Sequence, residues 1–414
     1  MHNSKFKKLT GKTLISAVDF SKNKHTGFFK TLMGDESPTF NFSNSREGFE
    51  KFWGKLQAFK KKYELDDVVV SFESTSTYGV PFIHFIRKKE VRMIQVNPKH
   101  TKRTKEIADN SPNKTDKKDP RVIANLIQLG NGLTVNIAEG HIQGLKNHIY
   151  NRESIIEEQK RVIGRIESHL AVYFPELLDL FSSIQSKTML HILRHYPMPE
   201  DLLQADPDKL EEELKTVSRG RVDQTKTNRI IKSARESIGI TEAGESYRST
   251  IKSFLEQLEL FNRQKKEIEK SINDLLEDIP QSKILLSVKG LGKISVAAIL
   301  SEIIDFHSFS TIREINKYSG FNLYEVSSGK YQGKRRLAKR GRALLRKTLF
   351  FATLNMIRKG GIFHEQYHRH LDKGMPPIKA IVALSRKLLR MIFAIVRDQR
   401  DFNIEKTKTI KTAA

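Results

Sequence analysis

The pattern of hydrophobic and polar positions changes twice along the 414-residue chain and divides it into three regions. In residues 1–136, the short apolar runs "TLISAVDF", "DVVVSFES" and "VRMIQVN" alternate with helical patterns at residues 45–63 and 77–89. Strands alternating with helices favour an α/β domain with a largely buried sheet. We also expect "KHTGFFKTLM" to pair with the first strand as a hairpin.

Seven-residue repeats dominate residues 137–281. Two apolar runs, at residues 142–173 and 251–279, approach four heptads, which is coiled-coil length. The a positions of the first run are Ile142, Ile149, Ile156, Ile163 and Leu170. We expect two long helices, paired either within the chain as an antiparallel hairpin or between the subunits of a dimer or tetramer. Helices of an ordinary bundle are the alternative, and prolines between the two runs predict short helices joined by turns.

The pattern of residues 282–414 predicts an all-α domain, which is strongly basic and interrupted by glycines. From residue 283 onward there are 27 Lys/Arg and 9 Asp/Glu, so +18 of the chain's net +25 lies here. Residues 330–347 hold nine Lys/Arg and no acid, and Leu337, Leu344, Leu345 and Leu349 suggest that this segment is a packed helix. A polyanion such as nucleic acid is the natural partner, because neutralising phosphates releases counterions. A solvated basic face or a ribosomal-type tail is the alternative.

Composition excludes several classes of protein. The chain has no cysteine, which excludes disulfides and thiolate metal sites. The first residues, "MHNSKFKKLTGK", lack the apolar core of a secretory signal. The most apolar run, "LLRMIFAIV", is too short to cross a bilayer. We therefore expect a protein of the cytoplasm, associated with the nucleoid, without a membrane partner.

Four carboxylates stand where a catalytic site could form. Asp19 and Glu73 end candidate strands, whereas Asp116 and Asp119 precede Pro120 inside the basic stretch "NKTDKKDPRVIANL". Carboxylates suit Mg²⁺, and a two-metal site about 3.5–4 Å across can stabilise both oxygens of an in-line phosphoryl displacement. Taken singly, each acid has an ordinary explanation. Asp119 in particular is expected at the N-cap of the helix that follows it.

A second feature, "SVKGLGKISVAAIL", resembles a helix-hairpin-helix. Gly290 and Gly292 would let backbone N–H groups approach a phosphate, with Lys289 and Lys293 beside them. A glycine-rich turn between two packed helices is nearly as good an interpretation of the same residues.

The order of these motifs resembles the insertion sequence 110 family of transposases, which are bridge-RNA-guided recombinases. "AVDFSK", "SFESTSTYGVP", "VNPKHTKRTKE" and "NKTDKKDPRVIANL" are similar to its RuvC-like DEDD domain. "LLSVKGLGKISVAAILSEIIDFHSFSTIREINKYSGF" and "VSSGKYQGKRRLAKRGRALLRKTLFFAT" are similar to its C-terminal transposase domain. The resemblance implies a RuvC/RNase H-like domain in residues 1–136, a coiled-coil region in 137–281 and a transposase domain in 282–414.

The same resemblance implies a mechanism and its residues. Asp19, Glu73, Asp116 and Asp119 would bind Mg²⁺, as two ions, and Ser328 of "SSG" would attack DNA, with Ser327 as the alternative. The protein would cleave and rejoin DNA to excise and insert its own element, and a structured guide RNA would choose the target. The residues expected to bind nucleic acid are Lys289, Gly290, Gly292, Lys293, Lys330, Lys334, Arg335, Arg336, Lys339, Arg340 and Arg342.

Two other functions fit the same residues. One is a metal-dependent junction endonuclease that hydrolyses DNA with water and never uses a serine, since "SSGK" taken alone is better explained as an ordinary turn. The other is a non-catalytic RNA-binding scaffold built on the coiled coil. The chain also departs from the family near Ser328, where "GFNLY" lacks the usual proline and Lys330 replaces a glycine.

Overall fold

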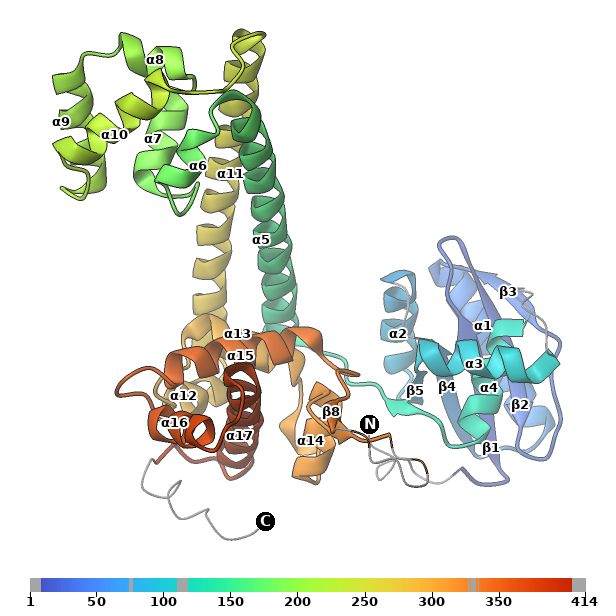
Figure 1. Ribbon diagram of the computed structural model, residues 1–414. Coiled ribbons are helices and arrows are strands. Elements are labelled where there is room, and N and C mark those ends of the chain that lie inside the picture. Colours follow the sequence, from blue (N-terminus) through green and yellow to red (C-terminus); the bar gives the residue numbers. More distant parts are fainter. Residues whose placement is uncertain are drawn as a thin grey trace. The chain divides into compact units, whose positions relative to one another are not determined.

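The computed structural model describes residues 9–73, 77–109, 118–326, 328, 333 and 335–403. The chain divides into two compact units (Figure 1). The first comprises Met1–Ile137 and Ile304–Arg346, and the second comprises Ala138–Ile303 and Lys347–Ala414.

A mixed six-stranded sheet forms the centre of the first unit, with the strand order β3-β2-β1-β4-β5-β6. The strands are β1 (Thr13–Asp19), β2 (Lys24–Thr31), β3 (Phe40–Ser43), β4 (Asp67–Glu73), β5 (Arg92–Val96) and β6 (Leu133–Thr134). β1, β4 and β5 are parallel, while β2 pairs antiparallel with β1. The predicted α/β domain and its first hairpin are therefore confirmed.

Helices cover both faces of this sheet. They are α1 (Arg46–Lys62), the short η1 (Thr77–Gly79), α2 (Val80–Arg87), α3 (Pro98–Asp109) and α4 (Lys118–Gln128). Leu14 and Val18 of β1 pack in one core with side chains of α1 and α2, whereas Ile15 and Ala17 pack in another with α4. This alternation is the period of two that a strand buried on both faces must show.

The first unit also contains a short, partly β segment from the C-terminal third of the sequence. Its elements are η2 (Phe306–Ser308), α14 (Ile312–Ser319), β7 (Leu323–Tyr324) and β8 (Arg336–Leu337). The prediction of an all-α C-terminal domain was wrong here, and Leu337 lies in a strand rather than in a basic helix. The helix α15 (Ala343–Met356) begins later because Lys339 has a left-handed backbone, with φ +52°, which no α-helix accommodates.

Two 34-residue helices, α5 (Gly140–Tyr173) and α11 (Gly244–Glu277), lie side by side in the second unit (Figure 1). Arg152 donates to Glu269 at 2.8 Å, and Gln159 donates to Asn262 at 2.8 Å. The residue farther along α5, Gln159, contacts the residue that comes earlier in α11, Asn262, so the two helices are antiparallel. Of the alternatives that the heptads left open, the structure has the hairpin within one chain.

The buried face of α5 differs from the predicted heptad register at two turns. Ile155 and Val162 are buried, whereas the predicted a positions Ile156 and Ile163 are half-buried. The sequence offers two adjacent apolar side chains at each of these turns, so the pattern alone cannot select between them. Packing against the neighbouring helix selects the first of each pair.

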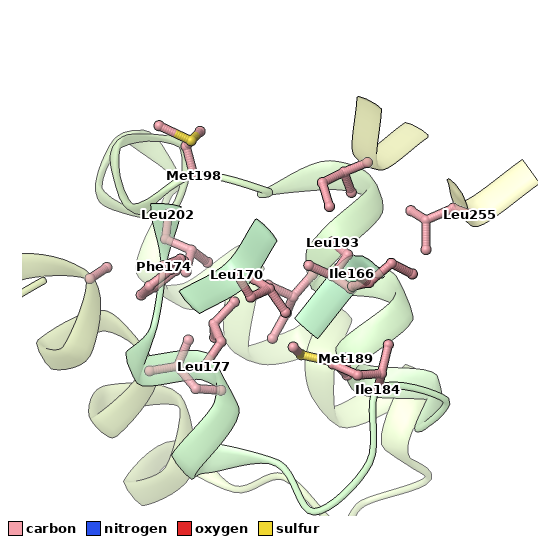
Figure 2. Close-up of a cluster of buried hydrophobic side chains, with 14 of the residues drawn as sticks. Ile166, Leu170, Phe174, Leu177, Ile184, Met189, Leu193, Met198, Leu202 and Leu255 are labelled. Atoms are coloured by element: carbon pink, nitrogen blue, oxygen red, sulfur yellow. The ribbon is translucent and has the colours of Figure 1, made fainter. Parts of the chain in front are cut away.

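Five short helices form a small bundle at one end of this hairpin, as the prolines predicted. They are α6 (Glu176–Leu180), α7 (Lys187–His195), α8 (Pro199–Gln204), α9 (Pro207–Ser218) and α10 (Gln224–Arg235). Ile166 and Leu170 of α5, Leu193 of α7 and Leu255 of α11 belong to one buried cluster (Figure 2). The bundle and the hairpin thus share a core.

The remaining helices of the second unit pack at the other end of the hairpin. They are α12 (Pro280–Leu286), α13 (Lys293–Glu302), α15, α16 (His364–Asp372) and α17 (Pro377–Arg397). Tyr150 of α5 donates to Glu302 of α13 at 2.7 Å. Within the described part of the chain, no helix is both long enough and apolar enough to span a bilayer.

Candidate active site

Asp19 and Glu73 end two neighbouring parallel strands. β1 and β4 are paired in a register that places Val18 beside Phe72, so the next residues, Asp19 and Glu73, are also side by side. Adjacent strands lie about 4.8 Å apart. Two carboxylates that are 54 positions apart in sequence therefore meet at the carboxyl edge of the sheet.

Both acids belong to the face of the sheet that α4 covers. Side chains alternate along a strand, so Asp19 shares its face with Ile15 and Ala17, and Glu73 shares its face with Val69. Ile15, Ala17 and Val69 all pack in the core that α4 forms on that face.

The direction of α4 determines which of its ends lies near these acids. Its Asn125 accepts from Lys30 at 3.0 Å, and its Arg121 lies 5.0 Å from the ring centre of Phe28. Lys30 pairs with Ile15 of β1, and Phe28 pairs with Ala17. From Asn125 to Arg121 the helix therefore advances toward Asp19, and its first turn lies at the carboxyl edge.

That first turn contains Asp119, which is buried, with 6% of its surface accessible to solvent. α4 begins at Lys118, so Asp119 is the second residue of the helix, and the expectation that it is the N-cap was wrong. Pro120 can occupy any position of the first turn, because no N–H there is needed by the helix. A carboxylate in the first turn is also favoured by the partial positive charge of a helix N-terminus.

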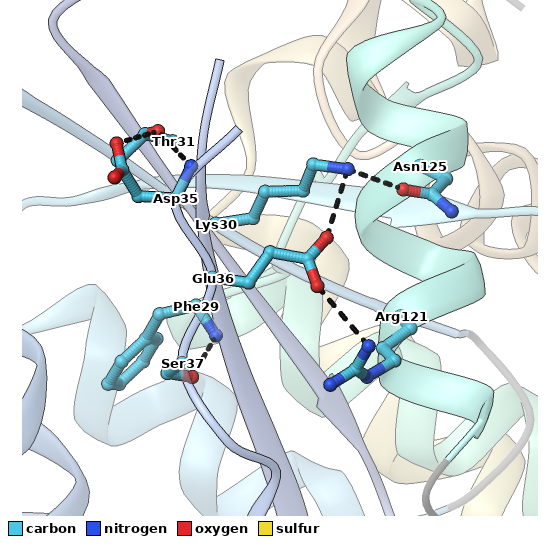
Figure 3. A network of polar contacts seen from close by, with 8 residues as sticks. All are labelled: Phe29, Lys30, Thr31, Asp35, Glu36, Ser37, Arg121 and Asn125. Carbon is cyan, nitrogen blue, oxygen red and sulfur yellow. Dashed lines mark hydrogen bonds and ion pairs between the residues drawn. The ribbon is translucent and has the colours of Figure 1, made fainter. Parts of the chain in front are cut away.

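A polar network that the sequence analysis missed holds α4 against the sheet (Figure 3). Glu36 accepts from Lys30 at 3.2 Å and from Arg121 at 3.2 Å, while Lys30 also donates to Asn125. The segment that carries Glu36 is fixed in turn by the bond from the Phe29 amide to Ser37, at 2.9 Å. Arg121 is 85 positions from Glu36, and Asn125 is 95 positions from Lys30. Contacts at such separations leave no periodic pattern, so the sequence analysis could not have found this network.

The fold thus directs three of the four predicted carboxylates to one edge of the sheet, and Asp116 lies outside the described residues. Among the residues that the structure describes, no group of three or more His, Asp or Glu side chains is arranged to hold a metal ion. The donor chemistry nevertheless fits Mg²⁺, which prefers hard carboxylate oxygens. The metal-binding role of Asp19, Glu73, Asp116 and Asp119 stays a prediction.

Ser328 is exposed and lies in the segment that joins β7 to β8, and Ser327 is outside the described residues. The base of this hairpin is closely fixed. The amide of Lys339 donates to Gly320 at 3.1 Å, and the amide of Arg342 donates to Tyr318 at 3.2 Å. A side chain at Gly341 would overlap the backbone of Tyr318 and Gly320. The loop that carries the predicted nucleophile therefore starts from a rigid base.

The predicted nucleic-acid contacts around this hairpin are largely on the surface. Arg335, Arg336, Lys339 and Arg340 are exposed, and Arg335 pairs with Glu325 at 3.0 Å. Arg342 is half-buried, with its guanidinium 5.3 Å from the ring centre of Tyr318. Lys330 and Lys334 lie outside the described residues.

The glycines between α12 and α13 have a structural explanation of their own. Gly290 has φ +104°, and a Cβ there would lie 2.8 Å from Cγ of Met356. Gly292 is the N-cap of α13. Lys289 and Lys293 are exposed on either side. Close packing on α15 alone accounts for Gly290, so nucleic-acid binding by this turn stays a prediction.

Comparison with known families gives the deciding observation. A model of DEDD transposases of the IS110 type matches residues 17–175, and a model described as the transposase IS116/IS110/IS902 family matches residues 282–368. The chain belongs to this transposase family. The first match contains all four predicted carboxylates, and the second contains Ser328 and the predicted basic contacts.

Two relatives from mobile elements align over most of this transposase. The uncharacterized 43.6 kDa protein of insertion element IS110 from Streptomyces coelicolor is 22% identical over 92% of this chain and 93% of its own. The uncharacterized 44.8 kDa protein of insertion element IS116 from Streptomyces clavuligerus is 20% identical over 70% of this chain and 72% of its own. Family membership supports a general role in transposition and implies an enzyme that acts on DNA.

Proposed function

We propose that this transposase is a RuvC-type DNA recombinase that excises and inserts its own element through a transient covalent bond between Ser328 and DNA. The observation that carries the proposal is the pairing of Asp19 with Glu73 in one strand register, on the face covered by the helix whose first turn contains Asp119. In a transposase, acids gathered at one edge of a sheet are best explained by phosphoryl transfer.

Asp19, Glu73, Asp116 and Asp119 would hold two Mg²⁺ ions. Bound there, the ions supply positive charge that stabilises the attacking and leaving oxygens of an in-line displacement. Without a cation the acids would repel one another. Strand register fixes Asp19 beside Glu73, and the network of Glu36 and Arg121 fixes the helix that carries Asp119. Nearby lysines and arginines would bind the backbone of the substrate.

Ser328 would carry the covalent step. Its Oγ forms a bond to the scissile phosphorus while the bond from phosphorus to a deoxyribose oxygen breaks, and that oxygen takes a proton. The new phosphoserine ester conserves the energy of the phosphodiester, so a second deoxyribose hydroxyl can reverse the step and rejoin a strand. The exposure of Ser328 is compatible with access to DNA.

The partners follow from the resemblance to bridge-RNA-guided recombinases. DNA at the element ends and at the target would be bound together by two or more subunits, and a structured guide RNA would choose the target. α5 and α11 use their apolar faces on each other, so subunit contacts would use the outer faces of this hairpin or other surfaces.

Trapping the covalent intermediate tests the proposal. A supercoiled plasmid carrying the ends of the element is incubated with Mg²⁺ and with protein purified together with the RNA transcribed from the element. Wild type and Ser327→Ala should give protein–DNA adducts on denaturing gels, and Ser328→Ala should give none. A Ser328→Ala protein that still nicks the plasmid at the normal rate would instead identify a hydrolytic endonuclease.

A further inference from the structure

The five-helix bundle at the end of the α5–α11 hairpin has a strongly divided charge. Residues 215–235 contain seven Lys/Arg and one Asp/Glu, whereas the rest of residues 174–243 contains three Lys/Arg and eleven Asp/Glu. The bundle is therefore acidic as a whole but carries one concentrated basic segment. Such segregation favours a polyanion at the basic segment, because the acids that predominate elsewhere in the bundle repel it.

The basic segment consists of the C-terminal end of α9, a short turn and α10. Arg219 and Gly220 in the turn have left-handed backbones, and Asp223 caps α10 by accepting from the Lys226 amide at 2.9 Å. Ile230 and Ala234 of α10 are buried in the core of the bundle. The inner face of α10 is thereby fixed, and its opposite face is left to solvent.

The exposed face of α10 presents Thr225, Asn228, Arg229, Lys232 and Arg235. These positions follow a spacing of three and four residues, so they lie along one side of the helix. The turn adds Arg219 and Arg221, which are exposed as well. We call this set of seven residues the α10 basic face.

Most cations of the α10 basic face are not neutralised within the chain. Over the described residues, Arg219, Arg221, Arg229 and Arg235 make no ion pair, and Lys232 approaches Glu236 at 3.8 Å. Elsewhere near the bundle, Arg248 is paired with Asp201 at 2.7 Å. The cations of this face are thus available to a ligand.

The shape and chemistry of this face favour duplex DNA over structured RNA. Arginine and asparagine are the side chains that read guanine and adenine edges, and an α-helix fits the major groove of B-form DNA. The major groove of an RNA duplex is too narrow for a helix. A single exposed helix preceded by basic residues is suited to lie in a DNA groove with the turn on the phosphates.

We propose that the α10 basic face binds duplex DNA in the major groove, as a contact separate from the proposed catalytic residues. α5 is 34 residues long, so the hairpin spans about 50 Å, the length of roughly 15 base pairs. The face therefore binds a stretch of DNA distant from the turn between α12 and α13 at the hairpin's other end. The choice of DNA rests on the proposed function, but binding needs neither Mg²⁺ nor Ser328.

Salt-dependent binding tests the electrostatic part of this proposal. Arg229→Gln/Arg235→Gln is compared with Lys187→Gln/Lys209→Gln, which removes two exposed charges of the same bundle outside the basic segment. Full-length proteins are titrated with a 30-base-pair mixed-sequence duplex in EDTA. In the first variant the negative slope of log K against log salt should become shallower by about 2, since each phosphate contact contributes roughly −0.9 to it. Equal slopes for the two variants would overturn the proposal.

Directed cleavage identifies the ligand. The chain has no cysteine, so Asn228→Cys can carry a single iron–EDTA group, with Glu212→Cys on the acidic part of α9 as the control. Both are made with Ser328→Ala, so that loss of the proposed catalysis has no effect on the result. The label at residue 228 should cut duplex DNA strongly, and the label at 212 weakly. Cutting of an RNA hairpin but not DNA, or equal cutting from both labels, would overturn the proposal.

Discussion

The carboxyl edge of the six-stranded sheet and the α10 basic face both gather like charges, but they are built in opposite ways. Asp19 and Glu73 end two strands that register places side by side, and Asp119 lies in the first turn of the helix that covers the same face of the sheet. The cations of the α10 basic face come from one helix and its preceding turn. The chemistry proposed for the first site would need fixed positions, whereas the binding proposed for the second would need the sum of several charges. A single substitution at the sheet edge should therefore remove most of the activity. A single substitution on the α10 basic face should lower DNA affinity only in part.

The largest expected effect separates these two sites most clearly. Glu73→Gln should lower strand cleavage by about a thousandfold or more, because a neutral amide cannot replace a carboxylate as a metal ligand. Glu64→Gln, which neutralises an exposed acid before the same strand, should leave cleavage within twofold of wild type. Cleavage is measured on plasmid DNA under single-turnover conditions. A modest loss at Glu73, similar to that at Glu64, would remove the contrast between the two sites.

The base of the β7–β8 hairpin should behave like the sheet edge, since its geometry is also fixed by close contacts. Gly341→Ala would overlap the backbone of Tyr318 and Gly320 and should reduce unfolding free energy by about 2–4 kcal/mol. Gly54→Ala, in the middle of α1 with open space around it, should instead stabilise the protein by about 0.5–1 kcal/mol. Denaturant unfolding of both variants gives the comparison. A stable Gly341→Ala protein would show that the loop of Ser328 has no rigid base.

Loss of the network around Glu36 should lower stability less than Gly341→Ala does, but it should lower cleavage without lowering DNA affinity. Arg121→Met removes a pair whose arginine is half-exposed, so we expect a loss of about 0.5–1 kcal/mol. If the pair positions the first turn of α4, cleavage should fall further than stability explains, while DNA affinity stays unchanged. A double-mutant cycle with Glu36→Gln measures the coupling. Cleavage that merely follows the loss of folded protein would make the network purely structural.

The smallest expected effect concerns His25, which is fully buried on the opposite face of the sheet among Phe20, Phe42, Phe49 and Phe82. Burial lowers the pKa of His25 below the ordinary value of 6.5. As the pH falls, the unfolded chain therefore binds this proton at a higher pH than the folded chain does. The contribution of neutral His25 to the free energy of unfolding is complete above pH 6.5 and is lost as the pH falls below it. Thermal unfolding of wild type should show this loss, and His25→Phe should show less of it. An identical pH dependence in both proteins would contradict the prediction.

Patterns with a short period predicted the strands, the hairpin of β1 and β2, and the two long helices. Alternation and heptads report which residues a single element buries, and that information is local. The choice of Ile155 over Ile156 depends on a partner helix more than 100 positions away, since the flanking residues Arg152 and Gln159 bond to Glu269 and Asn262. The pairing of α5 with α11 is non-local in the same way. For the same reason, the sequence alone gave no sign of the network of Glu36 with Arg121.

The residues of the candidate site also fall into those that the sequence predicted and those that it missed. Asp19 and Glu73 could be selected because each follows a buried strand, and the family resemblance added Asp116, Asp119 and Ser328. The short β7–β8 hairpin was missed, because its two-residue strands are set by backbone contacts at Gly320 and Gly341 rather than by side-chain periodicity. The α10 basic face was missed too, since its charges stand out against the acidic bundle and not against the basic chain.

The central claim is that the carboxyl edge of the sheet is a divalent-cation site, and direct titration tests it. Mn²⁺ binding is measured by calorimetry for wild type, Asp19→Asn and Asp66→Asn, where Asp66 is an exposed acid at the opposite edge, paired with Lys12 at 3.4 Å. Wild type and Asp66→Asn should bind Mn²⁺ with the same stoichiometry and affinity, and Asp19→Asn should lose the tight binding. Equal binding by all three proteins would contradict the account.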